Sequence, residues 1–321
     1  MRSLSRRRVI RISAAAAGLA LLPFGRALPA DVAAPVTWNG TALGAAAAIR
    51  IHHASTAEAE RLIRQALAEV RRLERIFSLY QADSALVELN ARGVLAAPPA
   101  ELVALLEECG TYWRLTGGAF DPTVQPLWQL FAGHFARPDA DPAGPPAAAV
   151  DAVLARVGYQ HLLVDADRIA FARRNMAVTL NGIAQGYITD RVVDLLKAGG
   201  IAQSLVDMGE VRALGWGPEG RPWSVGVTDP AQPDLILRTV DVTDQAVATS
   251  SGAALPFDAA GRFNHIFDPR TGFGAHAHRL VTVVMPSATA ADALSTAFSI
   301  LPAEATARTA PAFAGLRLFF G

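Results

Sequence analysis

The chain has 321 residues, 51% of them hydrophobic, and its 29 basic and 29 acidic side chains cancel to a formal net charge of zero. The charge balance excludes a basic footprint for nucleic acid, and the hydrophobic content excludes a mainly disordered chain. Cys109 is the one cysteine of the chain, so an intramolecular disulfide is excluded. No cysteine directly follows the predicted signal, where it could carry a lipid.

Residues 1–30 have the pattern of a secretory signal. A basic stretch is followed by an apolar run of about eleven residues and a small-residue end near Ala30. The run is shorter than the ~20 residues that span a bilayer, although retention as a membrane anchor stays an alternative. The pair Arg6-Arg7 after Ser5 resembles a twin-arginine signal, which exports folded proteins to the periplasm. We expect one mature domain over residues 31–321.

Hydrophobic periodicity predicts interleaved helices and strands through this domain. Helices are expected over residues 56–80, 99–116, 185–200 and 288–301. Strands are expected within residues 42–55, 160–173, 177–182, 204–215, 222–229, 237–252, 279–286 and 316–321, and the proline-rich residues 136–148 are expected to form a surface loop. Because several strands follow one another by short turns, we expect an α+β fold with mixed β-sheets flanked by helices.

The last predicted helix carries two oxygen-bearing side chains one turn apart, Asp292 and Thr296. Side chains at this spacing share a helix face, and two oxygen ligands on one face suit a hard cation such as Mg²⁺. The sequence from Thr289 to Asp292 also fits a capping box, in which the acidic side chain pairs back to the start of the helix. The spacing leaves both interpretations open.

Three polar turns are further candidates for a site. Residues 265–275 place His265 and Arg270 in one turn, a combination that suits an anionic substrate and a proton transfer, although a simple β-turn also fits. Gly182 and Gly186 stand where a strand is expected to enter a helix, so backbone N–H groups there could approach a phosphate. Residues 247–252 form a hydroxyl-rich turn of the same ambiguous kind.

Seven segments, in this order, resemble the FAD:protein FMN transferase (ApbE) family, and together they run through nearly all of the mature chain. They are residues 76–90, 117–128, 181–196, 206–215, 247–252, 265–272 and 291–297. The resemblance implies that FAD, as substrate, lies in a cleft between two lobes of one catalytic domain.

The resemblance also implies roles for individual residues. Asp292, Thr296 and the backbone carbonyl of Ala184 would bind Mg²⁺, and His265 would transfer a proton, so that His265 and Asp292 are the implied catalytic residues. The implied contacts to FAD are Tyr80, Asp121, Gly182, Asp190, Thr249, Ser250, Ser251, His265 and Arg270.

The implied reaction transfers FMN from FAD to a Ser or Thr hydroxyl of an acceptor flavoprotein, as a phosphoester, with release of AMP. An FAD pyrophosphatase and a non-catalytic flavin carrier or maturation factor are the alternatives. Gln185 stands where the family usually has a lysine. With the twin-arginine pattern, it resembles the branch associated with periplasmic nitrous oxide reductase maturation, whose expected acceptor is a membrane-bound electron-transfer protein.

Overall fold

The structure, a computed structural model, describes residues 19–21 and 35–321. Most of the predicted signal, residues 1–30, therefore lies outside the described residues. Its described part is β1 (Leu19–Leu21), whose backbone pairs antiparallel with β9 (Trp223–Asp229). In the described part of the chain, no helix is long and apolar enough to cross a membrane.

A seven-stranded sheet forms the centre of the larger lobe, with the strand order β13-β12-β11-β8-β7-β3-β2. The predicted α+β class is confirmed, and every strand pair in the described residues is antiparallel. The strands are β2 (Val36–Ala42), β3 (Ala45–His52), β7 (Gln203–Asp207), β8 (Val211–Leu214), β11 (Ala246–Ser250), β12 (Val281–Met285) and β13 (Arg317–Phe320).

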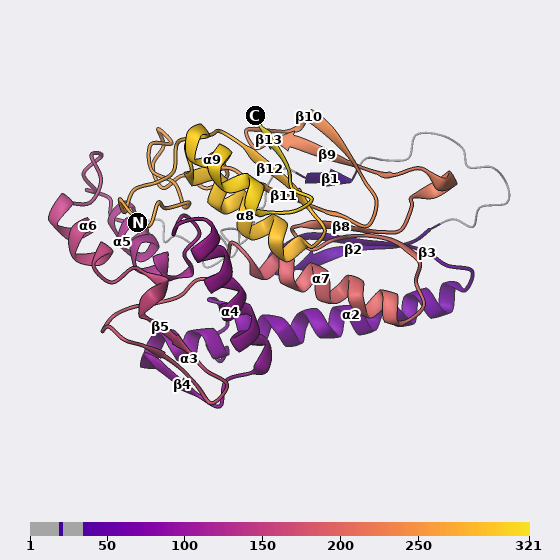
Figure 1. Cartoon of the computed structure of the whole chain (residues 1–321), viewed down its shortest axis with the longest axis horizontal. Helices are drawn as coiled ribbons and strands as arrows, with labels where there is room; N and C mark the ends of the chain where they lie inside the picture. The colour runs from indigo at the N-terminus through magenta and orange to yellow at the C-terminus, as the bar shows by residue number, and fades with distance from the viewer. Residues whose placement is uncertain (1–18, 22–34) are drawn as a thin grey trace.

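The central sheet lies between a layer of helices and a smaller sheet (Figure 1). In β11, Ala246 and Ala248 belong to the core beneath the helices, whereas Val247 packs on the opposite side with β9 and β10 (Gln232–Val242). This division follows from the two-residue period of a strand. The helices of this layer are α2 (Thr56–Phe77), α7 (Ala184–Ala198) and α8 (Ala288–Ile300), and α9 (Ala303–Thr309) leads into β13.

The smaller lobe is mostly helical. It comprises α3 (Ala85–Arg92), α4 (Ala100–Leu115), α5 (Gln125–Phe135), α6 (Ala147–Leu154) and a three-stranded sheet of β4 (Val94–Ala96), β6 (Arg168–Phe171) and β5 (Leu162–Val164).

An aromatic cluster joins this lobe to the loop between β11 and β12. The ring centroid of Phe131 in α5 lies between 5.1 and 6.3 Å from those of four phenylalanines in that loop, Phe257, Phe263, Phe267 and Phe273. Ring pairs at these distances contribute beyond the apolar area that they bury. The loop is therefore held against the helical lobe although both of its ends belong to the sheet.

The strand predicted over residues 177–182 is wrong. The side chain of Asn90 occupies the place of a neighbouring strand: its Nδ2 donates to the carbonyl of Val178 at 2.9 Å, and the backbone N–H of Val178 donates to its Oδ1 at 2.7 Å. Both backbone groups of Val178 are satisfied without a ladder, and residues 177–182 join no strand of the described sheets.

The N-termini of α7 and α8 cap each other. Asp190 of α7 accepts hydrogen bonds from the backbone N–H groups of Ala288, at 2.8 Å, and Thr289, at 2.9 Å. Asp292 of α8 accepts one from the N–H of Gly186, in the first turn of α7, at 3.0 Å. A carboxylate at a helix N-terminus meets unpaired N–H groups and the positive end of the helix dipole. The two contacts fix where the helices cross.

Gly186 leaves no room for a side chain at this crossing, because a Cβ atom there would lie 2.2 Å from the carbonyl oxygen of Ala288. We expect Gly186→Ala to lower the free energy of unfolding by about 1–3 kcal/mol, as overpacking does. The matched control is Gly133→Ala in α5, where a Cβ would meet nothing within 4 Å. Alanine should stabilise that helix by up to about 1 kcal/mol. Urea unfolding measures both, and the same change in both variants would contradict the prediction.

Candidate active site

A cleft between the lobes contains two adjoining cavities. The first, of about 120 Å³, is lined by residues of both lobes, from Phe120 and Trp128 to Thr249 and Asp292. The second, of about 340 Å³, lies between the β2–β3 turn, the end of α2 and α7. Asn181 and Gln185 line both, so a long ligand could extend from one cavity into the other.

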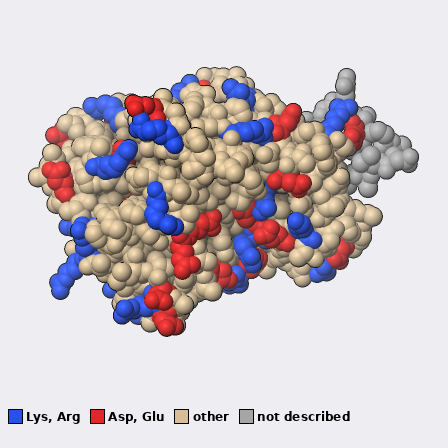
Figure 2. Space-filling model, viewed as in Figure 1, with Lys and Arg blue, Asp and Glu red and all other residues tan. Residues whose placement is uncertain are grey.

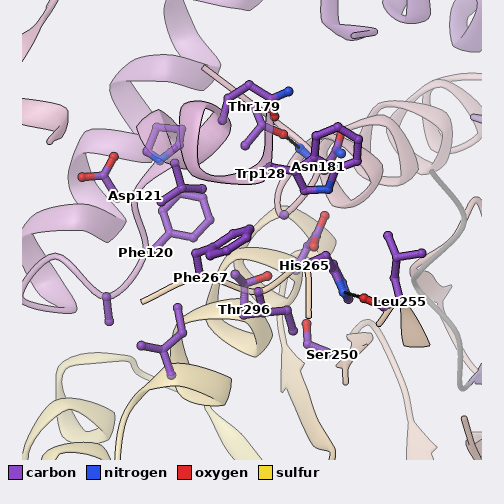
Figure 3. Close-up of a pocket in the computed structure, with 18 of the residues that line it drawn as sticks. Phe120, Asp121, Trp128, Thr179, Asn181, Ser250, Leu255, His265, Phe267 and Thr296 are labelled. Carbon is purple, nitrogen blue, oxygen red and sulfur yellow. Dashed lines mark hydrogen bonds between the residues drawn. The ribbon is translucent and has the colours of Figure 1, made fainter. Parts of the chain in front are cut away.

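Most of the predicted site residues line this cleft. In Figure 3, Phe120 and Asp121 come from the helical lobe, while Ser250, His265 and Thr296 come from the sheet lobe and its loop. The predicted residues that line the first cavity are Asp121, Gly182, Thr249, Ser250, His265, Asp292 and Thr296, and those that line the second are Tyr80 and Ala184.

Three predicted contacts to FAD line neither cavity: Asp190, Ser251 and Arg270. Both oxygens of Asp190 are engaged at the start of α8. The hydroxyl of Ser251 donates to the carbonyl of Arg279 at 2.7 Å. The guanidinium of Arg270 donates twice to Asp268, at 2.8 Å each, on the exposed surface. The first two side chains stabilise the walls of the cleft and the third forms a local turn, and their contact with FAD stays a prediction.

The capping box from Thr289 to Asp292 does not form. The N-cap of α8 is Ser287, whose hydroxyl accepts from the N–H of Ala290, so Asp292 lies in the second turn and turns towards Gly186 instead. Burial, together with the charge of Asp190, raises the pKa of Asp292 to about 7. Asp292 is thus a buried carboxyl on the cavity wall.

Thr296 completes an oxygen-rich corner with Asp292. A Cβ atom on Gly182 would lie 2.9 Å from Thr296 Oγ1, so the glycine keeps the space beside this hydroxyl open. A carboxylate and a hydroxyl, together with a backbone carbonyl such as the predicted one of Ala184 in the adjoining cavity, are the hard oxygen donors that Mg²⁺ takes. In residues 35–321, no group of three or more His, Cys, Asp or Glu could hold a metal ion. Three such donors leave half of the six positions of an octahedral ion for other ligands.

The cleft lacks basic side chains, since none of the described residues lining either cavity is a lysine or an arginine. The first cavity instead carries Asp121, Glu210 and Asp292. Burial raises the pKa of Asp121, and burial with the charges of Asp292 and Asp207 raises that of Glu210 well above its ordinary value. Burial thus favours the uncharged form of both carboxyls, and no lysine or arginine among the described lining residues supplies positive charge to an anionic ligand.

Basic and acidic side chains are interspersed on the outer surface. On the face in Figure 2, they alternate over both lobes and do not gather into a patch of one sign.

His265 lies on the loop that the aromatic cluster holds. The side chain of Asn264 fixes the loop, donating to the carbonyl of Ala275 at 2.9 Å and accepting from the N–H of Ile266 at 3.0 Å. His265 Nδ1 donates to the carbonyl of Leu255 at 3.3 Å, which leaves the Nε2 lone pair as the acceptor. Burial lowers the pKa of His265 to about 4, so the imidazole is neutral at physiological pH.

Sequence reasoning missed the apolar wall and one acid. Phe120, Trp128 and Phe267 line the first cavity, and all three lie inside segments that the sequence singled out. Glu210 lies there too, between the strands β7 and β8. An acidic residue between two apolar strands is a signal that could have found it, because such residues are rarely buried without a reason.

A model of the ApbE family matches residues 43–320 of the chain. The FAD:protein FMN transferase of Treponema pallidum is 31% identical over 291 residues, which cover 82% of this chain and 78% of that relative. The FAD:protein FMN transferase of Escherichia coli K12 is 30% identical over 244 residues, covering 72% and 68%.

Solved structures that resemble this chain are also ApbE proteins. The Pseudomonas stutzeri flavinyl transferase ApbE, in its apo form, superimposes with a TM-score of 0.76 at 28% identity, over 91% of this chain and 92% of that one. The apbe protein of Thermotoga maritima gives a TM-score of 0.78 at 27% identity, over 89% and 94%.

The titration of His265 is a direct test of its environment. We expect its midpoint near pH 4 in histidine NMR spectra, well below the ordinary 6.5. Because the unfolded chain binds this proton near pH 6.5 and the folded chain only near pH 4, lowering the pH through this window favours unfolding. His265→Gln should therefore lose less stability than the wild type between pH 6.5 and 4. A midpoint near 6.5 would contradict a desolvated, neutral imidazole.

Proposed function

We propose a reaction mechanism on the premise that the chain belongs to the ApbE family, as its family match and its relatives show. The chain is an FAD:protein FMN transferase. In finer detail, we propose that it transfers FMN from FAD to a Ser or Thr hydroxyl of an acceptor protein, depends on Mg²⁺ and releases AMP.

One observation carries this proposal: Asp292, Thr296 and a neutral His265 line the same cavity, which no described lysine or arginine enters. The diphosphate of FAD brings negative charge that the cleft cannot neutralise by itself. Asp292, Thr296 and the carbonyl of Ala184 would hold Mg²⁺. When bound, this ion supplies the positive charge that stabilises a phosphoryl group under attack.

His265 is the proposed general base. Its Nδ1 is held by the carbonyl of Leu255, so Nε2 can accept the proton of the incoming hydroxyl. The hydroxyl oxygen then bonds to the phosphorus on the flavin side, the bond from that phosphorus to the bridging oxygen breaks, and AMP leaves with the bridging oxygen. A positioned base contributes about 10²–10⁴-fold to such a step.

The adjoining cavities suit an elongated dinucleotide. The first cavity has apolar walls that include Phe120 and Phe267, which limit the access of water to the reacting groups. Tyr80 lines the second cavity and is 39% exposed, so its ring is available for stacking on a planar ring system. FAD would place its diphosphate near the shared wall at Asn181 and Gln185.

Localisation and acceptor are further parts of the proposal. The pattern around Arg6-Arg7 supports export of the protein to the periplasm by a twin-arginine-type signal, residues 1–30. The Gln185 form of the glycine segment supports a membrane-bound electron-transfer protein of nitrous oxide reduction as the acceptor flavoprotein. Mass spectrometry of such a protein, co-expressed with this chain, would locate FMN on a threonine or serine.

The transferase reaction can be separated from its two alternatives in one assay. Purified protein is incubated with FAD, Mg²⁺ and a candidate acceptor, and the products are followed by in-gel flavin fluorescence and AMP release. We expect a fluorescent acceptor and an equal amount of AMP. AMP without labelled protein would instead indicate an FAD pyrophosphatase. The absence of both products would indicate a flavin carrier.

The proposed metal ligands are tested in the same assay. We expect Asp292→Ala to abolish transfer at every Mg²⁺ concentration with the fold retained, although the lost hydrogen bond to Gly186 should cost about 0.5–2 kcal/mol of stability. Thr296 offers a matched pair of variants. Thr296→Ser keeps the hydroxyl and should retain activity, whereas Thr296→Val has a similar shape without it and should lose at least about tenfold, one coordination bond being worth more than 1.4 kcal/mol. Equal activity in both Thr296 variants would exclude this hydroxyl as a ligand.

A further inference from the structure

Three consecutive apolar side chains are exposed in the first half of β10. Leu235, Ile236 and Leu237 are 46%, 42% and 45% exposed. Every other exposed large apolar side chain in the described residues stands alone in the sequence. Successive side chains of a strand point to opposite faces, so neither face of β10 is covered at this point. Single exposed apolar side chains are ordinary on a protein surface, whereas a run of three indicates a contact surface.

β10 is an edge strand, because β9 is the one strand that pairs with it in the described sheets. The ladder between the two has register shifts on either side of Ile236, and these leave Leu235 and Leu237 outside the described pairing. The extra residues of a bulge do not pair with the opposite strand, and an edge offers its backbone N–H and C=O groups to another strand. Charged side chains usually protect such an edge, but these three positions have none.

The second half of β10 is in contact with the central sheet. Arg317 of β13 donates from Nη2 to the carbonyl of Asp241 at 2.9 Å and to Gln245 Oε1 at 3.1 Å. The guanidinium of Arg238 lies 4.8 Å from the ring centroid of Phe319, also in β13, so its charge is held in place. The open part of the edge therefore ends at Arg238, and we call residues 234–238 the open edge.

The open edge is complementary to a second copy of itself. Asp234 precedes the three apolar residues and Arg238 follows them, and both charged side chains are exposed. In an antiparallel pairing with a two-fold axis at Ile236, Asp234 of each copy lies opposite Arg238 of the other, and Leu235 lies opposite Leu237. Opposite charges and apolar pairs at facing positions stabilise a sheet. A parallel pairing in register would instead place like charges side by side.

We propose that the open edge binds a second copy of this chain by antiparallel strand pairing about a two-fold axis at Ile236. The small sheets of the two copies then join edge to edge, and each copy uses the same residues, as a two-fold interface requires. β10 lies across the central sheet from α2 and α7 (Figure 1), and none of residues 234–238 lines either cavity of the cleft. Because the contact is limited to five residues of each copy, the dimer is weak and forms at high protein concentration.

Charge reversal tests the pairing. Sedimentation velocity of the full chain over a concentration series gives the dissociation constant of the dimer. We expect Asp234→Arg or Arg238→Asp to weaken the dimer about tenfold, because two opposite-charge pairs become two like-charge pairs. The double variant with both changes should return to within about threefold of the wild type, because both pairs form again with their signs exchanged. Asp151→Arg, at an exposed aspartate in α6, is the matched control and should change nothing.

A cysteine at the two-fold axis tests the register. Residues directly opposite each other in antiparallel strands have Cα atoms about 4.5–5.5 Å apart, a distance that a disulfide spans. We expect Ile236→Cys to give a disulfide-linked dimer under mild oxidation, and Cys109 does not compete because it is buried. Asp234→Cys should not cross-link, because its two copies would lie about 13 Å apart along the strands. Leu163→Cys, at an exposed leucine in β5, measures random collision.

Three results would overturn the proposal: a full chain that is monomeric at every concentration, a double charge variant as weak as the single ones, or Leu163→Cys cross-linking as readily as Ile236→Cys. A monomeric chain in which Ile236→Asp slows FMN transfer at unchanged affinity for FAD would assign the open edge to an extended segment of the acceptor and exclude the second copy. Unfolding midpoints and FAD affinity show that each variant is folded, because none of the changed residues lines the cleft.

Discussion

The crossing of α7 and α8 positions the site, because each helix gives an aspartate to the N-terminus of the other. Both oxygens of Asp190 are engaged, by the start of α8 and by Arg212, whereas Asp292 accepts from Gly186 through one oxygen and also lines the cavity. One hydrogen bond does not offset the burial of this carboxyl, as its pKa of about 7 indicates. A cation beside Thr296 would complete the compensation, so the contact that joins the helices also places the proposed metal ligand on the cavity wall.

A lysine or arginine in the cleft would both orient a phosphate and neutralise its charge, but the described lining has neither residue. Here the described lining offers an amide at Gln185, a carboxyl at Glu210 and the oxygen donors near Asp292, without a basic side chain. In the proposed reaction, neutralisation of the diphosphate depends on a bound cation, because no lysine or arginine among the described lining residues supplies the charge.

Local patterns predicted the parts of the structure that depend on local physics. The helices α2 and α8 followed from apolar spacing, and the shared face of Asp292 and Thr296 followed from their separation. The segment 177–182 has a strand pattern, but Asn90, far away in the sequence, satisfies its backbone. The choice between a capping box and a cavity ligand for Asp292 likewise depended on Gly186, 106 residues earlier. Helix α5 went unpredicted because Pro126 and Gly133 weaken its local signal.

The aromatic cluster around Phe131 affects when His265 can lie close to Asp292 and Thr296. The loop that carries His265 is anchored on the helical lobe, while Asp292 and Thr296 belong to a helix of the sheet lobe. Any hinge movement that widens the cleft therefore draws the imidazole away from the oxygen-rich corner. The chain would assemble its reactive geometry only when closed around both partners, and an open enzyme with FAD alone would be a poor hydrolase. In the proposed reaction, this tethering would limit cleavage of FAD by water until the acceptor is bound.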